Sequence, residues 1–388
     1  MINTLKEQLS KIDRIQFANL PTPLEYCNNL TKYLNVKEIF IKRDDLTGLA
    51  FGGNKVRHLE FRFGYIKKFN FNHIVNANMG ISNNARLWSA ASIINNVPLT
   101  LIMSKELNTE LQGNHLLNYL KNINLIYSKT ENEEILHNEA IKYGENLKSK
   151  GLKPYITVLE PFNEVAAILS YLNTAIELNQ QFKELGLKKI HIFQASGSSY
   201  IGMCLAKKIL KLDHWKITGI GPRLQPRMRD IRGITNKTIN LFDKNFVNKL
   251  NFEYLDYNEI NWDLSFYGNG YGLSTIESIN AIKLLAELDK SKKDAALMAR
   301  LGGADSQTMQ DAISRQTVEK YAPELRKADI EARVNALKFA TERMNLDQAS
   351  RNNLIKSYGL PYETQFNMEQ KLYNNRMTAP SESGTLNN

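Results

Sequence analysis

The chain has 388 residues, of which 43% are hydrophobic and 23% charged, and its formal net charge is +10. These values are typical of a globular protein with two domains, or with one two-lobed unit and an appendage. A basic charge suits nucleic acid, a membrane surface or an anionic ligand, and by itself selects none of them. Because the lysines are dispersed and form no tract, we interpret most of them as solvent-facing and expect no nucleic-acid partner.

The cysteines and the apolar runs limit the location of the protein. Cys27 and Cys204 give neither the spacing of a metal site nor a disulfide framework, which favours a reducing, cytoplasmic compartment and no bound metal. Charged residues interrupt the stretch from Met1 to Ile15, so it lacks the apolar segment of a signal peptide. No later run reaches the length that spans a bilayer, and we expect no membrane partner.

From residue 37 to about residue 210, short runs of β-branched and aromatic residues alternate with longer helical stretches, and a similar run follows at Lys216 to Ile220. The predicted strands are Glu38 to Lys42, His73 to Ala77, Leu99 to Met103, Asn124 to Ser128, Tyr155 to Leu159, Ile190 to Gln194 and Lys216 to Ile220. The predicted helices are Asn84 to Ile94, Leu111 to Asn122, Glu131 to Lys148, Glu164 to Leu185 and Tyr200 to Leu210. This alternation predicts an α/β fold of parallel sheets covered by helices, in which ligands bind at the carboxyl ends of the strands.

The first polar loop that follows a predicted strand ends in Phe51-Gly52-Gly53-Asn54-Lys55 and precedes a helix that we expect to begin near Val56. Glycines let backbone amides approach an anion closely, and a helix N-terminus offers unpaired N–H groups to it. Lys55 would then present its amine to a small anionic ligand. An ordinary turn that carries a solvent-exposed lysine is the alternative.

Two further loops have comparable chemistry. One runs from Asn78 to Asn84, and the other is Ala195-Ser196-Gly197-Ser198-Ser199; each follows a predicted strand and precedes a predicted helix. A strand, a Gly/Ser turn and a helix N-terminus together can bind a phosphate group through amides and hydroxyls. The alternative for the second of these loops is a plain helix-capping turn, because serine is a preferred N-cap.

Several motifs together resemble one known family. They are Thr22-Pro23-Leu24-Glu25, the run from Ile41 to Arg57, Leu59-Glu60-Phe61, Ser82-Asn83-Asn84-Ala85-Arg86, Ser196-Gly197-Ser198-Ser199-Tyr200-Ile201-Gly202 and Gly268-Asn269-Gly270-Tyr271-Gly272-Leu273-Ser274-Thr275. They are similar to motifs of the D-cysteine desulfhydrase and 1-aminocyclopropane-1-carboxylate deaminase family. The resemblance covers roughly residues 15–288. It implies the two-lobed fold of the tryptophan-synthase-β type, the cofactor pyridoxal 5'-phosphate and a homodimer.

The resemblance also implies roles for individual residues. Lys55 would hold the cofactor as a Schiff base and, once released from it, act as a base, with Asn54 beside it in the cofactor site. Asn83 would lie by the pyridine 3-hydroxyl, and Ser82 would contact the substrate as an acid, base or nucleophile. Tyr271 would face the substrate, although a packed aromatic residue is the alternative. The phosphate would be bound by Ser196, Gly197, Ser198 and Ser199.

This sequence departs from the family pattern at several positions. Ser198 stands where the family has a second glycine, and its Cβ would weaken phosphate binding if the backbone there needed a positive φ. Ser199 replaces threonine and keeps the hydroxyl, and Asn84 replaces histidine and removes a titratable group. The segment 159–163 differs from the family's Gly-Gly-Ser-Asn turn. After Leu288 the family's strand with its active-site tyrosine is not found.

The resemblance and the change of composition after residue 288 define the expected domains. A larger cofactor-binding lobe comprises residues 1–56 and 165–288, and a smaller α/β lobe comprises residues 57–164. Residues 289–377 form a helical extension, and residues 378–388 a disordered tail. The extension carries an apolar stripe at Ile330, Val334, Leu337, Ala340 and Met344. It is either an added helical segment or a replacement of the family's own C-terminus.

The resemblance therefore predicts a pyridoxal-phosphate-dependent lyase or deaminase that acts on a small amino acid. D-cysteine, giving pyruvate, sulfide and ammonia, and 1-aminocyclopropane-1-carboxylate are the first candidate substrates. The missing C-terminal segment motivates the alternative: a protein of this fold that has lost turnover and acts through its helical tail in protein interactions.

Overall fold

The structure is a computed structural model that describes residues 1–78, 82–104, 113–120, 123–130, 132–195, 197–221, 230–266, 275–284 and 287. The chain divides into two units, Met1–Asp289 and Lys290–Asn388. All described residues belong to the first unit. The helical extension predicted for residues 289–377 and the tail predicted for residues 378–388 lie outside the described residues, and the predicted division into two lobes stays a prediction.

The first parallel sheet confirms the predicted alternation of strands and helices. Its strands are β3 (His73–Asn78), β4 (Leu99–Ser104), β5 (Asn124–Ser128) and β6 (Pro154–Ile156), all parallel, in the order β5-β4-β3-β6. The helices between them are α4 (Asn83–Ile94), α5 (Gly113–Leu120) and α6 (Glu133–Ser149). All six residues of β4 are buried, as expected for a central strand covered on both faces. Strand β6 ends at Ile156, before the end of the predicted strand Tyr155 to Leu159, because a turn begins at Thr157.

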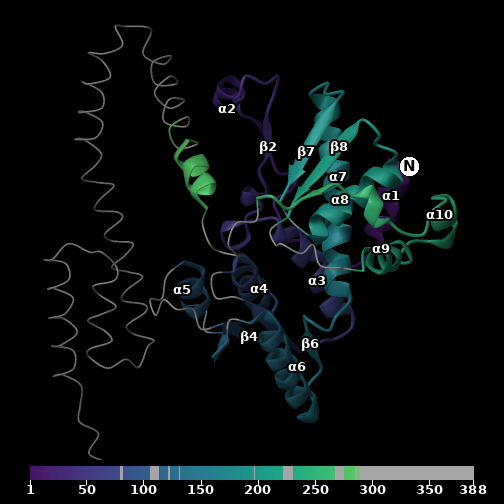
Figure 1. The fold of residues 1–388 in the computed structure, drawn as a ribbon. Coiled ribbons are helices and arrows are strands. Elements are labelled where there is room, and N and C mark those ends of the chain that lie inside the picture. The colour runs from purple at the N-terminus through teal and green to yellow at the C-terminus, as the bar shows by residue number, and fades with distance from the viewer. Residues whose placement is uncertain are drawn as a thin grey trace, which may run out of the picture. The chain divides into compact units, whose positions relative to one another are not determined.

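The second parallel sheet has the order β7-β8-β9, with β7 (Ile190–Gln194), β8 (Trp215–Ile220) and β9 (Trp262–Asp263). The helices associated with it are α7 (Phe162–Glu184), α8 (Ser198–Leu210), α9 (Ile231–Ile239) and α10 (Lys244–Asn248). Helices α7 and α8 lie side by side (Figure 1), and α7 also packs on α3 (Lys55–Lys68). This long, mostly apolar helix therefore contributes to the largest hydrophobic core of the described residues.

The N-terminal segment differs from the prediction. It contains α1 (Ile2–Ser10), β1 (Leu24–Tyr26), α2 (Asn28–Tyr33), β2 (Phe40–Lys42) and the short 3-10 helices η1 (Asp44–Leu46) and η2 (Leu49–Phe51). We predicted a strand near β2 as part of a parallel unit, but β2 pairs antiparallel with β1 in a two-stranded sheet. The connection contains only the six-residue α2, which returns the chain beside β1 instead of carrying it across a sheet. The loop of Lys55 thus starts from this small sheet.

We expect Gly202→Ala to destabilise the packing of α7 on α8. A Cβ at Gly202 would lie 2.7 Å from the carbonyl oxygen of Ile168 and 2.8 Å from the Cβ of Tyr171. Overpacking of this kind costs about 1–3 kcal/mol. Urea unfolding followed by circular dichroism measures the cost, with Lys207→Ala on the same helix as the control. Equal unfolding midpoints for the two variants would contradict the close approach of these helices.

Candidate active site

The loop that precedes Lys55 has an unusual backbone. Ala50, Phe51, Gly52 and Gly53 have φ angles of 42°, 68°, 70° and 125°, all in the left-handed region. A Cβ at Gly52 would lie 1.9 Å from the carbonyl oxygen of Asp45, so only glycine fits there. The Gly53 N–H donates to the Asp44 carbonyl at 3.0 Å and to the Thr47 hydroxyl at 2.9 Å. The loop therefore has one defined conformation that delivers Lys55 to the first position of α3.

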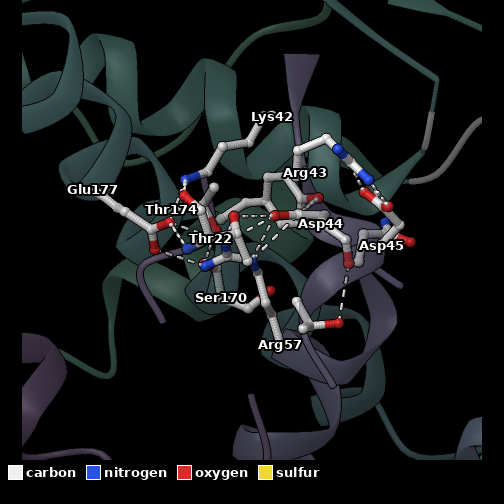
Figure 2. A network of polar contacts seen from close by, with 12 residues as sticks. Thr22, Lys42, Arg43, Asp44, Asp45, Arg57, Ser170, Thr174 and Glu177 are labelled. Carbon is white, nitrogen blue, oxygen red and sulfur yellow. Dashed lines mark hydrogen bonds and ion pairs between the residues drawn. The ribbon is translucent and has the colours of Figure 1, made fainter. Parts of the chain in front are cut away.

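A buried ionic network holds the base of this loop (Figure 2). Arg57, which is 2% exposed, donates from Nη2 to Asp44 Oδ1 at 2.8 Å and from Nη1 to Glu177 Oε2 at 2.9 Å. Its Nη2 also donates to the Thr22 hydroxyl at 3.0 Å. The arginine on α3 thus joins the segment before the loop to a carboxylate on α7, which is 120 residues away in the sequence.

Three more side chains complete the network. Lys42 forms an ion pair with Glu177 and donates to the Gln181 amide oxygen at 2.8 Å. The Tyr171 hydroxyl donates to Asp44 Oδ2 at 3.0 Å. Two cations therefore face two carboxylates, which is the condition under which buried charges are tolerated.

The pKa values of the network follow from this pairing. Burial alone would lower the pKa of Arg57, but the hydrogen bonds and charges of Glu177 and Asp44 raise it above its ordinary value. Burial alone would likewise raise the pKa of Glu177, but Arg57 and Lys42 outweigh it and hold this pKa below its ordinary value of 4.5. Both groups are therefore ionised at neutral pH.

Lys55 has a different environment from Arg57. Its side chain is half-buried, and no hydrogen bond or ion pair of its amine is found in the part of the chain that the structure describes. Burial, followed by the positive charge of Arg62, lowers the pKa of Lys55 from its ordinary value of 10.5. A lower pKa increases the fraction of neutral amine, the form that is nucleophilic.

Arg62 is a second cation on α3 that forms no ion pair with a carboxylate among the described residues, although the charge of Glu164 acts on it. It is 6% exposed, and its Nε and Nη2 donate to the carbonyl oxygen of Asn163 at 3.2 and 2.9 Å. Its Nη1 is buried without a partner, and burial lowers the pKa of Arg62 to about 10. Because neither Lys55 nor Arg62 forms an ion pair among the described residues, the interior near the start of α3 has a positive charge that suits an anion.

The predicted serine and asparagine of the second loop lie at the start of α4. Ser82 is its N-cap: its hydroxyl accepts from the Asn84 N–H at 3.2 Å and donates to Asn78 Oδ1 at 3.2 Å. Asn83 is exposed, and its amide oxygen accepts from Asn114 Nδ2 at 2.9 Å. The Ser82 hydroxyl is thus buried within its own loop, whereas Asn83 points its amide toward α5.

The third loop meets the Lys55 loop directly. Gly197 is the N-cap of α8, and Ser198 is its first residue, without a positive φ, so the backbone strain expected for a serine at this position does not arise. Ser199 is fully buried: its hydroxyl lies 2.9 Å from His58 Nε2 and 3.4 Å from the Asn54 amide nitrogen that donates to it.

Both amide atoms of Gln194, the last residue of β7, are buried without a hydrogen-bond partner. Two site residues predicted from the sequence, Ser196 and Tyr271, lie outside the described residues.

The second loop is joined to the first through α4. Arg86 Nη2 donates to the carbonyl oxygen of Gly52 at 3.1 Å, and its guanidinium lies 5.8 Å from the centre of the Phe51 ring. The helix that begins after Ser82 therefore contacts the glycine loop. Helix α4, which begins after Ser82, thus contacts the Lys55 loop, and the start of α8 contacts Asn54 and His58.

Sequence reasoning missed the residues that support the site. Arg57 and Asp44 stood within the motifs but received no role, and Glu177, His58 and Arg62 were not considered. One signal was present: Glu177 is the only charged residue in the apolar stretch between Glu164 and Lys183. A lone carboxylate on a buried helix indicates a buried partner.

The described residues contain neither a metal-binding cluster nor a membrane-spanning helix. No group of three or more His, Cys, Asp or Glu side chains among them is placed to bind a metal ion. No helix among them combines the length and the apolar character needed to cross a membrane.

Comparisons with known proteins give consistent results. The model of the pyridoxal-phosphate dependent enzyme family matches residues 15–300. A putative 1-aminocyclopropane-1-carboxylate deaminase of Pyrococcus abyssi is 33% identical over 214 residues, which are 55% of this chain and 63% of that protein. The chain therefore spans less than two thirds of this relative. The solved structure of an ACC deaminase homologue has a TM-score of 0.59 and 25% identity, and covers 79% of this chain and 93% of its own.

We expect Glu177→Gln to destabilise the protein by about 3 kcal/mol, because it removes the ion-pair partner of Lys42 and leaves Arg57 with Asp44 alone. The pKa of Glu177 is below 4.5 in the folded protein, so its contribution is complete above pH 4.5 and disappears as the pH falls through the folded pKa. Unfolding of the variant and of the wild type by urea, at a series of pH values, measures this difference.

The matched control is Glu145→Gln, which removes the exposed pair with Lys148. We expect that pair to contribute less than about 1 kcal/mol. A difference between the wild type and Glu177→Gln that was as small as the control, or that grew on acidification, would contradict the assigned role of the network.

Proposed function

The chain belongs to the pyridoxal-phosphate dependent enzyme family, and we propose on this basis that it is a lyase or deaminase acting on a small amino acid. The first candidate is D-cysteine, converted with water into pyruvate, sulfide and ammonia. The second is 1-aminocyclopropane-1-carboxylate, which the name of the Pyrococcus relative suggests. Both reactions need an amine-binding cofactor and a group that transfers a proton, at the α-carbon of D-cysteine or at a carbon next to the α-carbon of 1-aminocyclopropane-1-carboxylate.

The observation that carries the proposal is the setting of Lys55. Its amine has no ion-pair partner among the described residues and a lowered pKa, and it stands at the N-terminus of α3 beside the start of α8. A structural lysine in a protein interior is normally paired, as Lys42 is with Glu177. An unpaired amine at this position is better explained as a reactive group.

The described residues fit pyridoxal phosphate at both of its ends. Lys55 would hold the aldehyde carbon, and the amides at Gly197 and Ser198 would hold the phosphate at the N-terminus of α8. The positive charge of Lys55 and Arg62 and the unpartnered amide of Gln194 suit an anionic, polar ligand in the same region. When bound, the cofactor supplies the electron sink that makes the α-proton of an amino acid removable.

Roles near the substrate follow from the second loop. The Ser82 hydroxyl is held by Asn78 and by the backbone of α4, so its orientation is defined before any substrate arrives. We assign it to contact with the substrate and to proton transfer at its oxygen. Asn83 would orient the pyridine ring, and Tyr271 would face the substrate. A neutral Lys55 would accept the α-proton of D-cysteine at Nζ once it is released from the cofactor; 1-aminocyclopropane-1-carboxylate has no α-proton, so this role does not apply to it.

Assembly and location extend the proposal. The family resemblance supports a homodimer, and the pair of free cysteines supports a cytoplasmic location. The division into a larger lobe, residues 1–56 and 165–288, and a smaller lobe, residues 57–164, is consistent with the two separate parallel sheets.

We expect Lys55→Ala to abolish covalent binding of the cofactor and to lower turnover by at least about 10²–10⁴-fold, because both the anchoring amine and the base are lost. The full chain is incubated with pyridoxal phosphate, and the visible absorption of the lysine-bound cofactor is recorded. Release of ammonia, pyruvate and sulfide is then measured on a panel containing D-cysteine and 1-aminocyclopropane-1-carboxylate.

Lys67→Ala is the matched control, because Lys67 is an exposed lysine in the last turn of the same helix. It should retain both the absorption and the turnover of the wild type. Absence of the absorption from the wild type would refute the proposed function. Covalent binding without release of any product across the panel would refute turnover while leaving the cofactor site in place.

A further inference from the structure

The N-terminus of α3 and the N-terminus of α8 are joined by one buried hydrogen bond. His58 Nε2 lies 2.9 Å from the Ser199 hydroxyl oxygen, and these side chains are 5% and 0% exposed. His58 is three residues after Lys55 on α3, and Ser199 is two residues after Gly197, the N-cap of α8. The bond therefore connects the helix that carries the reactive amine with the helix whose start faces the proposed phosphate.

Asn54 reinforces the same junction. Its amide Nδ2 donates to the Ser199 hydroxyl at 3.4 Å. Asn54 and His58 are four residues apart at the start of α3, so their side chains lie on the same face of the helix. The Ser199 hydroxyl is therefore contacted by Asn54, which precedes Lys55, and by His58, which follows it. Both contacts join α8 to the start of α3.

The surroundings of His58 keep its imidazole neutral. Burial, followed by the positive charges of Arg62, Lys55 and Arg57, holds the pKa of His58 well below its ordinary value of 6.5. A neutral ring pairs with a hydroxyl without adding another cation beside Lys55. The rings of His58 and Tyr171 pack in a T-shaped arrangement with their centres 5.9 Å apart, and this contact holds the imidazole in place.

We propose that His58 is a positioning residue that sets the separation between the Lys55 amine and the start of α8, so that both ends of one cofactor molecule are received at once. The inference rests on the proposed function, because it requires that the cofactor bridges these two places. A ligand held at two points gains affinity only if the points are held at the separation of its two ends. The junction thus contributes to binding of the intact cofactor more than to binding at either end.

Comparison of pyridoxal phosphate with pyridoxal, which lacks the phosphate, tests this separation. In the full chain, His58→Leu should weaken binding of pyridoxal phosphate about tenfold, the effect of one buried hydrogen bond. It should change binding of pyridoxal to Lys55 by less than about twofold. Visible absorption during titration gives both affinities, and circular dichroism shows whether the variant is folded.

Two other variants keep the test decisive if His58→Leu does not fold. Ser199→Ala removes the other partner and should show the same selective loss for pyridoxal phosphate. His58→Gln keeps a side-chain amide within reach of Ser199 and should restore most of the wild-type affinity. His73→Leu is the matched control: it breaks the 2.9 Å bond to the Thr100 hydroxyl between β3 and β4, and should leave both affinities unchanged.

The outcomes separate this inference from the proposed function. Wild-type affinity for pyridoxal phosphate in folded His58→Leu or Ser199→Ala would overturn the inference alone. An equal loss of affinity for pyridoxal and pyridoxal phosphate would also overturn it, because it would show general damage around Lys55. Failure of the wild type to bind pyridoxal phosphate at all would overturn the proposed function and the inference with it.

Discussion

The candidate site depends on the burial of Arg57 between Asp44 and Glu177. These three charges come from η1, α3 and α7, and Arg57 would lie in the interior without compensation if both carboxylates were absent. Breaking a buried ion pair costs several kcal/mol, so a folded chain must bring the three segments together. The loop that carries Lys55 runs between Asp44 and Arg57. The ion pair of these two residues therefore holds both ends of the loop without any bound ligand.

This constraint explains how the strained loop can persist. Left-handed backbone at Ala50 and Phe51 costs of order 1–3 kcal/mol for each residue, and an isolated peptide would avoid it. In the folded protein the loop is bound on one side by Asp44 and Thr47 through Gly53, and on the other by Arg86 through Gly52. The energy of the ionic network is thus partly used to hold Lys55 in one position, which is the preorganisation that a binding site requires.

The sequence predicted the parts of the structure that have local patterns. The runs at β5 and β7 and the long helix α7 could be recognised from composition, and the motif around Lys55 from resemblance. The antiparallel direction of β2 could not be predicted from the sequence, because the pairing of β2 with β1 depends on the path of the short connection between them. The pair of Arg57 with Glu177 left no local pattern either, since charged residues on a helix normally face water and their contact spans 120 residues. The loops expected to form the site have a sequence pattern, whereas the contacts that hold the Lys55 loop do not.

Three of the cations of helix α3, Lys55, Arg57 and Arg62, are compensated differently, and the difference has a physical reason. Arg57 is neutralised by two carboxylates, whereas Lys55 and Arg62 form no ion pair among the described residues. If all three were paired, no charge would remain to attract an anionic ligand, and the amine of Lys55 would be held protonated. If none were paired, the cost of burying them would exceed what packing of one helix supplies. His58, kept neutral between them, adds a contact to α8 without adding charge. Helix α3 can therefore carry both Arg57, which stabilises the fold through its ion pairs, and Lys55, whose amine is left unpaired among the described residues and reactive.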